Sequence, residues 1–211
     1  MGFEDLLADI KEVMAKPEVS RIVKSRMRSF KALRDSDPQT MLRELAFCVL
    51  AANFRAEESM RIVEIIGDRL GDLGYEELAS ELRRLGHRYP NSRARYIVEA
   101  RGKLDQIMEA MRRIRDEREL RSWLVENIKG LGLKEASHFL RNVGYGNLAI
   151  IDFHIIRILR RYGLIEEFRS LTRRRYLEVE RLLERIADQL GISLAELDLY
   201  LWYMDSGKIL K

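Results

Sequence analysis

Residues 123–144 read Trp-Leu-Val-Glu-Asn-Ile-Lys-Gly-Leu-Gly-Leu-Lys-Glu-Ala-Ser-His-Phe-Leu-Arg-Asn-Val-Gly, and this stretch decides the fold. Apolar residues at helical spacing flank a short turn, Gly130-Leu-Gly132. Glycine adopts positive φ without steric cost and lets a backbone approach closely, so two glycines around one apolar residue suit a sharp reversal. We therefore predict a helical hairpin with Leu131 between its two helices. A purely structural hairpin would use the same glycines, so the turn alone does not indicate a function.

The rest of the chain also carries the signals of helices rather than strands. Apolar residues recur at helical spacing, and no segment alternates β-branched with polar residues. Asp37-Pro38, Asp116, Thr172 and Ser193 are suited to begin helices as N-caps. We predict an all-α fold of roughly ten helices. Outside the hairpin, the expected helices cover 3–13, 19–33, a segment from 38, 56–70, 75–85, a long basic stretch from Arg93, 173–190 and the segment after Ser193.

The composition is that of a folded, slightly basic protein. Of 211 residues, 46% are hydrophobic and 34% are charged, so the apolar side chains can offset chain entropy and a wholly disordered chain is excluded. The length suits one substantial domain or two small ones that share a core. Lys and Arg number 38 against 34 Asp and Glu, which gives a net charge of +4. This modest excess permits an anionic partner such as nucleic acid without requiring one.

Cysteine content and hydropathy exclude several classes of site. A single cysteine, Cys48, rules out an intramolecular disulfide, and with only three histidines it cannot build a four-cysteine iron–sulfur cluster or a structural zinc finger. The longest apolar run, Leu45–Ala52, is far shorter than the ~20 residues that span a bilayer. We therefore expect a cytoplasmic protein in a reducing compartment, with no metal centre and no membrane partner.

Two features follow the hairpin turn. Lys134 begins the second hairpin helix, and the apolar run from Leu148 then ends in Asp152. Asp152 is well placed to cap the next helix, a structural role that can coexist with a catalytic one. Arginines are frequent beyond this point, and they form either a solvated helix face or a surface for nucleic acid. The residues are Arg157, Arg160, Arg161, Arg169, Arg173, Arg174 and Arg175, opposed within that interval by Glu166 and Glu167.

These residues carry a family resemblance. Gly130-Leu-Gly-Leu-Lys-Glu-Ala-Ser, followed by Ile151-Asp-Phe-His, resembles the helix-hairpin-helix–Gly/Pro/Asp superfamily of DNA glycosylases, although Gly144-Tyr-Gly146 lacks the proline of the pattern. A lysine at the fifth position of Gly-x-Gly-x-Lys marks the members that are glycosylase and AP lyase together. The segments 45–53 (Leu-Ala-Phe-Cys-Val-Leu-Ala-Ala-Asn) and 201–211 (Leu-Trp-Tyr-Met-Asp-Ser-Gly-Lys-Ile-Leu-Lys) are similar to those of compact, archaeal-type (second-type) 8-oxoguanine DNA glycosylases.

The resemblance implies an architecture. It implies two packed helical lobes with the active site in the cleft between them. A central lobe of approximately residues 38–160 would hold the hairpin at 118–144, and residues 1–37 with 161–211 would form the second lobe. The partner would be double-stranded DNA that contains 8-oxoguanine, bound by a monomer that associates with the nucleoid.

The resemblance also assigns the chemistry to Lys134 and Asp152. The damaged base must leave the helical stack, at a cost of about a few kcal/mol. Lys134 would then attack C1′, expel the base and form a Schiff base, after which β-elimination breaks the strand. The positive end of a helix favours the neutral amine that this attack needs. Asp152 would stabilise positive charge on the sugar and help move protons.

Base recognition would use aromatic rings and the C-terminal residues. An extruded purine needs a stacking face and hydrogen bonds to its edge, for which Trp202 and Tyr89 are candidates. The resemblance implies that Lys211 helps to distinguish 8-oxoguanine, which has an N7–H donor, from guanine. Trp202 could equally be a core residue, with a tail that merely frays. The roles of His138 and His154 stay open, because an isolated histidine is more often structural than catalytic.

The hairpin itself would contact the DNA backbone. Amide groups around Gly130, Leu131 and Gly132, at a helix N-terminus, suit a phosphate. No organic cofactor is expected. The superfamily resemblance does imply a monovalent cation that bridges to a DNA phosphate, held by backbone carbonyls around Glu126, Ile128 and Leu131.

Three other interpretations remain open. A non-catalytic helix-hairpin-helix DNA-binding module would share the glycine turn and the basic residues, but it would not need Lys134 or Asp152. A related glycosylase could prefer another lesion, such as an oxidised pyrimidine. A helical scaffold without a nucleic-acid partner would show no salt-dependent affinity for DNA.

Overall fold

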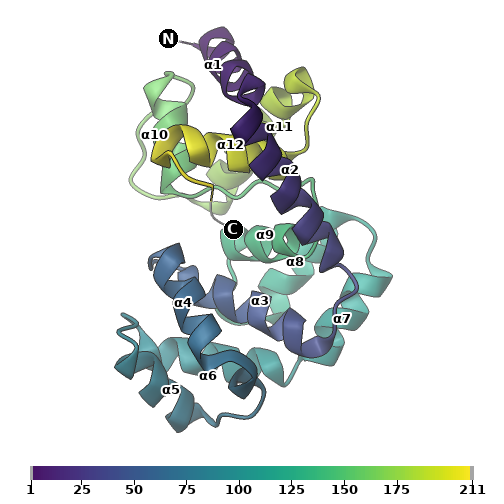
Figure 1. Ribbon diagram of the computed structural model, residues 1–211, viewed down its shortest axis with the longest axis vertical. Helices are drawn as coiled ribbons and strands as arrows, with labels where there is room; N and C mark the ends of the chain where they lie inside the picture. The colour runs from purple at the N-terminus through teal and green to yellow at the C-terminus, as the bar shows by residue number, and fades with distance from the viewer. Residues whose placement is uncertain (1, 210–211) are drawn as a thin grey trace. The chain divides into compact units, whose positions relative to one another are not determined.

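The computed structural model describes residues 2–209, and over this range it contains helices and turns but no strand (Figure 1). The predicted all-α class is confirmed. The predicted contact of Lys211 lies outside the described residues. The helices are α1 (Phe3–Ala15), α2 (Pro17–Ala32), α3 (Pro38–Ala51), α4 (Ala56–Ile66), the 3-10 helix η1 (Gly67–Gly71), α5 (Tyr75–Arg84), α6 (Pro90–Arg101), α7 (Leu104–Arg113), α8 (Glu117–Asn127), α9 (Leu133–Asn142), α10 (Phe153–Arg161), α11 (Arg173–Leu190) and α12 (Leu194–Ser206).

The chain forms two compact units. The central unit is Leu33–Val143, and the terminal unit combines the segment up to Ala32 with the segment from Gly144 onward. The sequence had suggested a boundary near residue 160, which would leave Asp152 with the hairpin. Instead, Asp152 and α10 belong to the terminal unit, because α10 packs against α12.

The core of the central unit is built around α3. Nearly every side chain from Met41 to Ala51 is buried, as expected of a helix that is apolar on all sides. This helix packs against α4, α6, α7 and α9. The buried Glu44 carboxylate accepts a hydrogen bond from Asn142 Nδ2 at 3.1 Å, so α3 also fixes the end of α9. The second hairpin helix is therefore anchored in the core.

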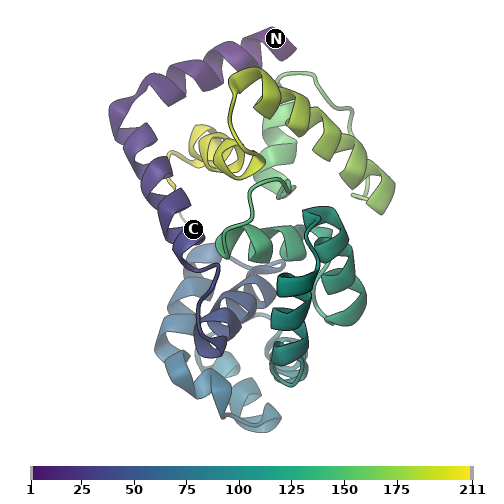
Figure 2. The same ribbon diagram turned by 90° about the vertical axis from the view of Figure 1, so that its right-hand side faces the viewer.

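The core of the terminal unit is built around α12. Its residues from Leu194 to Leu201 are largely buried, and it packs against α1, α2, α10 and α11. Figure 2 shows α1 and α2, drawn in purple, meeting at an angle that encloses α12. Tyr162 at the end of α10 donates to Asp9 of α1, and burial together with this bond raises the pKa of Tyr162 to about 12. The two ends of the chain thus frame the helix that carries Asp152 at its start.

The predicted caps are confirmed. The side chains of Asp37, Asp116, Thr172 and Ser193 each accept a hydrogen bond from a backbone amide in the first turn of the helix they precede. Such bonds satisfy amides that have no partner within the helix. Short polar side chains before apolar repeats were therefore sufficient to place four helix starts.

The long basic stretch from Arg93 differs from the prediction. The helix begins three residues earlier, at Pro90, with Tyr89 as its N-cap residue. Proline at the first position already has a helical φ and needs no amide partner. The helix therefore begins at Pro90, before the polar residues Asn91 and Ser92, and not after them. The stretch also breaks at Gly102 and Lys103, which separates α6 from α7.

Candidate active site

The predicted hairpin is formed by α8 and α9 of the central unit. Gly130 has a φ of +89°, and Leu131 is buried, as expected for the residue between the helices. A Cβ atom at Gly130 would lie 2.6 Å from Cδ2 of Tyr96, a ring carried by α6. Both the backbone conformation and the neighbouring ring therefore require glycine at this position.

The two turn glycines should differ in their tolerance of a methyl group. We expect Gly130→Ala to lower the free energy of unfolding by about 2 kcal/mol or more, from the positive φ and the contact with Tyr96. Gly132→Ala should cost less than about 1 kcal/mol, because its φ is −92° and the added carbon meets only the carboxylate end of the Glu135 side chain, which a small rotation can move away. Urea unfolding of both variants measures this. Equal losses would contradict the account.

The turn amides are partly occupied within the protein. The Gly132 amide donates to Glu135 Oε2 at 3.2 Å, and the Leu131 amide donates to the Ile128 carbonyl at 3.3 Å. Two of the amides predicted to bind a phosphate therefore already have acceptors within the protein. Glu135 thus supplies the carboxylate half of a capping box at the start of α9, so a phosphate at the Gly132 amide would have to displace that carboxylate.

Lys134 is the second residue of α9, at the positive end of the helix dipole. Its side chain is only 22% exposed, and its Nζ lies 3.8 Å from Glu135 Oε1. The amine is therefore held near the turn instead of extending freely into solvent. This position at a helix N-terminus is the one predicted for the nucleophile.

Carbonyl groups gather where α8 ends. The Asn127 carbonyl accepts a hydrogen bond from Lys103 Nζ at 2.7 Å, and the Ile128 carbonyl accepts the Leu131 amide. A carbonyl oxygen has two lone pairs, so Ile128 can accept a second partner. The last carbonyls of a helix also carry partial negative charge. Of the expected ligands, the Ile128 carbonyl therefore keeps a lone pair that suits a monovalent cation, and the neighbouring Asn127 carbonyl already binds an ammonium group.

Asp152 begins α10 in the terminal unit. Its Oδ1 accepts the backbone amides of His154 at 2.9 Å and Ile155 at 3.1 Å, which confirms the predicted cap. The side chain is partly exposed, and Oδ2 makes no hydrogen bond among residues 2–209. One oxygen thus holds the helix while the other remains available. The carboxylate can serve as both cap and reactive group.

A buried carboxylate that sequence reasoning missed lies beside Trp202. Asp205, whose side chain is 1% exposed, accepts His154 Nδ1 at 2.5 Å and Arg157 Nη2 at 2.6 Å. The His154 ring in turn lies 4.7 Å from that of Trp202, centroid to centroid. The candidate base-binding Trp202 is therefore linked through His154 to the helix that Asp152 begins.

A sequence signal for Asp205 existed. Residues 154, 157 and 161 share one face of a helix, and three potential cations on one face favour an anionic partner nearby. Arg161 Nη2 also lies 3.5 Å from Asp205. The arginine run is consequently less cationic than its local count indicated, because Asp205 and Glu178, which pairs with Arg174 at 2.8 Å, both lie outside the interval that was counted.

Tyr89 is an exposed ring on the central unit. It is 38% exposed, and the guanidinium carbons of Arg88 and Arg93 lie 5.2 and 5.7 Å from its centroid. Arg93 also donates to the Ala52 carbonyl at 2.6 Å, which ties α6 to the turn after α3. In that turn, exposed Asn53 has a φ of +56°, a strained conformation of the kind that collects at functional sites. Sequence analysis did not single out Asn53.

The position of Tyr89 depends on a neutral histidine. The Tyr89 amide donates to His87 Nδ1 at 3.1 Å, and His87 Nε2 lies 3.0 Å from the Leu50 carbonyl, so the ring accepts at one nitrogen and donates at the other. Burial lowers the pKa of His87 below its usual 6.5.

This histidine predicts a loss of stability in mild acid. The neutral ring stabilises the fold above pH 6.5, and that contribution is lost as the pH falls from 6.5 through the lower pKa of the folded state. We expect His87→Gln to reduce the difference in the free energy of unfolding between pH 7.5 and pH 5. Urea titrations of wild type and variant at both pH values measure it. Equal differences would show that His87 is not responsible.

The predicted site residues divide between the two units. Lys134, Tyr89 and the hairpin belong to the central unit, and Asp152 and Trp202 belong to the terminal unit. His138 is buried in the central core, with its ring at right angles to that of Phe47.

The part of the chain that the structure describes contains no helix suited to cross a membrane. Residues 2–209 also contain no group of three or more His, Cys, Asp and Glu side chains that could hold a metal ion.

Comparison with known proteins identifies the family. The family model described as 8-oxoguanine DNA glycosylase matches residues 23–192. An 8-oxoguanine DNA glycosylase/AP lyase of Korarchaeum cryptofilum is 50% identical over 100% of both chains, and one of Methanocaldococcus jannaschii is 45% identical over 95% of this chain and 97% of its own. The crystal structure of Methanocaldococcus jannaschii 8-oxoguanine glycosylase/lyase with 15mer DNA containing 8-oxoguanine is 44% identical, with a TM-score of 0.92 over 98% of this chain and 99% of that one. This chain therefore belongs to the 8-oxoguanine DNA glycosylase family.

Proposed function

We propose that this chain is a bifunctional 8-oxoguanine DNA glycosylase and AP lyase that acts on double-stranded DNA. The observation that carries the proposal is the half-buried Lys134 amine at the start of α9, directly after the glycine turn. A nucleophilic amine at a helix N-terminus is what Schiff-base chemistry requires. The names of the relatives, which are 8-oxoguanine DNA glycosylase/AP lyases, support the same reaction.

Lys134 supplies the electron pair in this reaction. Its neutral Nζ attacks C1′ of the extruded nucleotide, the bond between C1′ and N9 breaks, and the base leaves with that electron pair and gains a proton. Opening of the sugar gives an iminium ion between C1′ and Nζ. Loss of a proton from C2′ then expels the 3′ phosphate and breaks the strand, and water releases the enzyme.

Asp152 supports the same steps electrostatically. As the base departs, positive charge develops on the sugar, and a fixed carboxylate stabilises it without reorganising. The free Oδ2 can also accept and return a proton, while Oδ1 keeps the start of α10 in place. The two oxygens thus allow one side chain to hold the helix and take part in the reaction.

Recognition of the base falls to Trp202, Tyr89 and Lys211 in this proposal. Trp202 offers a half-buried ring backed by His154, and Tyr89 offers an exposed ring. Aromatic faces of this kind stack on unpaired bases. Lys211 would contribute at the C-terminus to the discrimination between 8-oxoguanine and guanine.

The hairpin would hold the DNA backbone. Gly130, Leu131 and Gly132 would approach a phosphate, and the carbonyls of Glu126, Ile128 and Leu131 would hold a monovalent cation. When bound, the cation supplies positive charge to a DNA phosphate. We also propose that the enzyme is a monomer and that it acts in the cytoplasm.

A substrate panel tests the proposal and separates it from its alternatives. We expect base release and strand scission on a duplex with 8-oxoguanine opposite cytosine, scission at a preformed abasic site, and no reaction at guanine. Salt-sensitive binding without any cleavage would instead support a non-catalytic hairpin module. Faster cleavage at an oxidised pyrimidine would show that the enzyme prefers a lesion other than 8-oxoguanine.

A further inference from the structure

A cavity of about 590 Å³ opens in the terminal unit at the start of α10. Its lining includes Asp152, Phe153, Arg157, Arg160, Phe168 and Arg169. We call it the Arg169 cavity. Because Asp152 lies in its wall, an occupant of this cavity is a neighbour of the carboxylate proposed to act on the sugar.

The Arg169 cavity has an excess of positive charge. Arg169 is exposed and forms no ion pair with any residue between 2 and 209. Arg160 lies 3.6 Å from the exposed carboxylate of Glu167, and its buried Nε has no hydrogen-bond partner in the described part of the chain. Arg157 pairs with Asp205 at 2.6 Å, a carboxylate that Arg161 also approaches at 3.5 Å. Arg169 thus offers an unpaired guanidinium group to an anion, and Arg160, which also donates to the Phe168 carbonyl at 3.5 Å, adds positive charge that the exposed Glu167 only partly balances.

Aromatic rings provide the other part of the lining. Phe153 is 66% exposed, although it directly follows Asp152, and the Arg157 guanidinium carbon lies 5.2 Å from its ring centroid. Phe168 is held by Arg160 and Arg175, each at 5.2 Å from its centroid. Burial in the core does not explain the exposed Phe153 ring. Its position suits contact with an apolar or aromatic group from outside.

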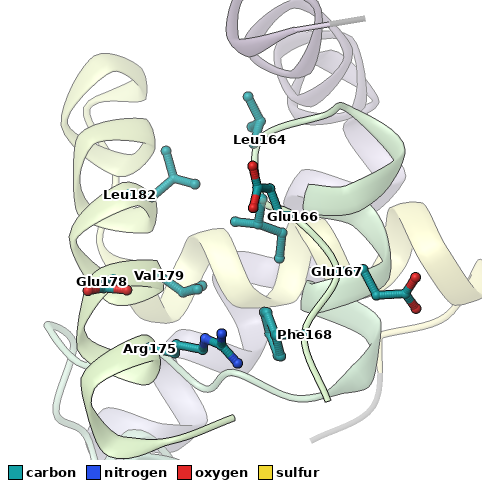
Figure 3. Close-up of a pocket in the computed structure, with 9 residues that line it drawn as sticks. Leu164, Glu166, Glu167, Phe168, Arg175, Glu178, Val179 and Leu182 are labelled. Atoms are coloured by element: carbon teal, nitrogen blue, oxygen red, sulfur yellow. The ribbon is translucent and has the colours of Figure 1, made fainter. Parts of the chain in front are cut away.

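A neighbouring pocket differs from the Arg169 cavity in the charge of its lining. It has a volume of about 410 Å³, shares Phe168 with the Arg169 cavity and contains Arg175 together with Glu166, Glu167 and Glu178. In Figure 3, Arg175 points toward Phe168, and the carboxylates come from α11 and the loop before it. Three carboxylates against one guanidinium make that pocket unsuited to a phosphate. Arg175 instead donates to the Ser170 carbonyl at 3.3 Å and fixes the loop that carries Arg169.

We propose that the Arg169 cavity seats the nucleotide next to the flipped one on the damaged strand. Its phosphate lies on Arg160 and Arg169, and its sugar or base lies against Phe153. Guanidinium groups bind phosphate oxygens strongly, and a ring beside them suits the rest of a nucleotide. The inference rests on the proposed function, because it takes Asp152 to act on the neighbouring sugar. It adds a specific contact with the DNA strand that the catalytic residues do not provide.

The first test compares two arginines that differ in position. Binding is measured on a duplex with a 2′-fluorinated 8-oxoguanosine, whose glycosidic bond resists cleavage. We expect Arg169→Gln to weaken binding about threefold to tenfold and to reduce the salt slope by about 1. Arg174→Gln is the matched control, because Arg174 is 87% exposed, pairs with Glu178 and lies outside the cavity. Equal effects of the two substitutions would overturn the proposal.

The second test locates the phosphate. Single neutral methylphosphonates replace each phosphate that flanks the lesion, in both wild type and Arg169→Gln. We expect one position next to the lesion at which the methylphosphonate weakens DNA binding by the wild type but causes no further loss of binding in Arg169→Gln. Additive losses at every position would mean that Arg169 contacts no particular phosphate, which overturns the proposal. Phe153→Ala should weaken binding of the same duplexes without changing the salt slope.

The outcomes separate this inference from the proposed function. Binding to a duplex with a tetrahydrofuran abasic analogue repeats both tests without any need for catalysis. If the methylphosphonate result is positive but the substrate panel shows no cleavage, the cavity holds DNA and the enzymatic proposal fails. If cleavage occurs but Arg169 and Arg174 behave alike, the enzymatic proposal stands and the cavity proposal fails. Selective binding of an acidic peptide, with no effect on DNA, would also overturn the cavity proposal.

Discussion

Lys134→Gln is expected to abolish both strand scission at 8-oxoguanine and covalent trapping of the protein on DNA by borohydride. Glutamine has nearly the length of lysine but no amine, so neither the attack on C1′ nor the Schiff base can form. Single-turnover cleavage should fall by at least about a thousandfold, as for the loss of other enzymic nucleophiles. Affinity for DNA should change little, because the side chain is only 22% exposed and its charge is partly balanced by Glu135.

The hairpin offers a matched control for this variant. Lys129 precedes the turn, its side chain is 72% exposed and its Nζ lies 3.3 Å from Glu99. Lys129→Gln removes one positive charge from the same hairpin but leaves the proposed nucleophile intact, so trapping should persist. Loss of trapping in both variants would indicate that the substitutions impair DNA binding and not the attack on C1′. Persistent trapping in Lys134→Gln would assign the Schiff base to another amine.

Asp152→Asn is expected to have the second largest effect. Asparagine caps helices as well as aspartate does, so its oxygen can still accept the amides of His154 and Ile155. Only the negative charge and the proton acceptor are lost. We expect base excision to slow by about 10²–10⁴-fold, with the melting temperature nearly unchanged.

A second substitution at the same position separates the two roles of Asp152. Asp152→Ala removes the cap as well as the charge and should lower the free energy of unfolding by about 1 kcal/mol. Its excision rate should resemble that of Asp152→Asn. Thermal unfolding and single-turnover excision of both variants provide the comparison. Full activity in Asp152→Asn, with a stability loss in Asp152→Ala, would leave Asp152 as a helix cap alone.

Local features of the fold were predictable from the sequence because each has a local cause. Asp152 follows an apolar run and precedes a helix, so its capping role could be inferred directly. Gly130 was identified as a turn residue, whereas the Tyr96 ring that forbids any side chain there comes from a distant helix. The start of α6 was misplaced because proline at Pro90 outweighed the polar residues after it.

Features that depend on packing between distant segments were less accessible. Asp205 lies in the apolar tail, and its pairing with His154 and Arg157 spans about fifty residues of sequence, so the cations on one face of α10 indicated an anionic partner but not which carboxylate supplies it. The assignment of Asp152 to the terminal unit likewise depends on the contact between α10 and α12. Family resemblance supplied the role of Lys134, because spacing alone does not distinguish a catalytic lysine from a surface one.

Peptide mapping of the borohydride-trapped complex would identify the residue that forms the Schiff base. The wild-type protein is incubated with a duplex that contains one 8-oxoguanine, reduced, digested with protease and nuclease, and analysed by mass spectrometry. We expect a deoxyribose adduct on the peptide that contains Lys134, and none on the peptide that contains Lys129. An adduct on a different lysine, or strand cleavage with no adduct, would contradict this expectation.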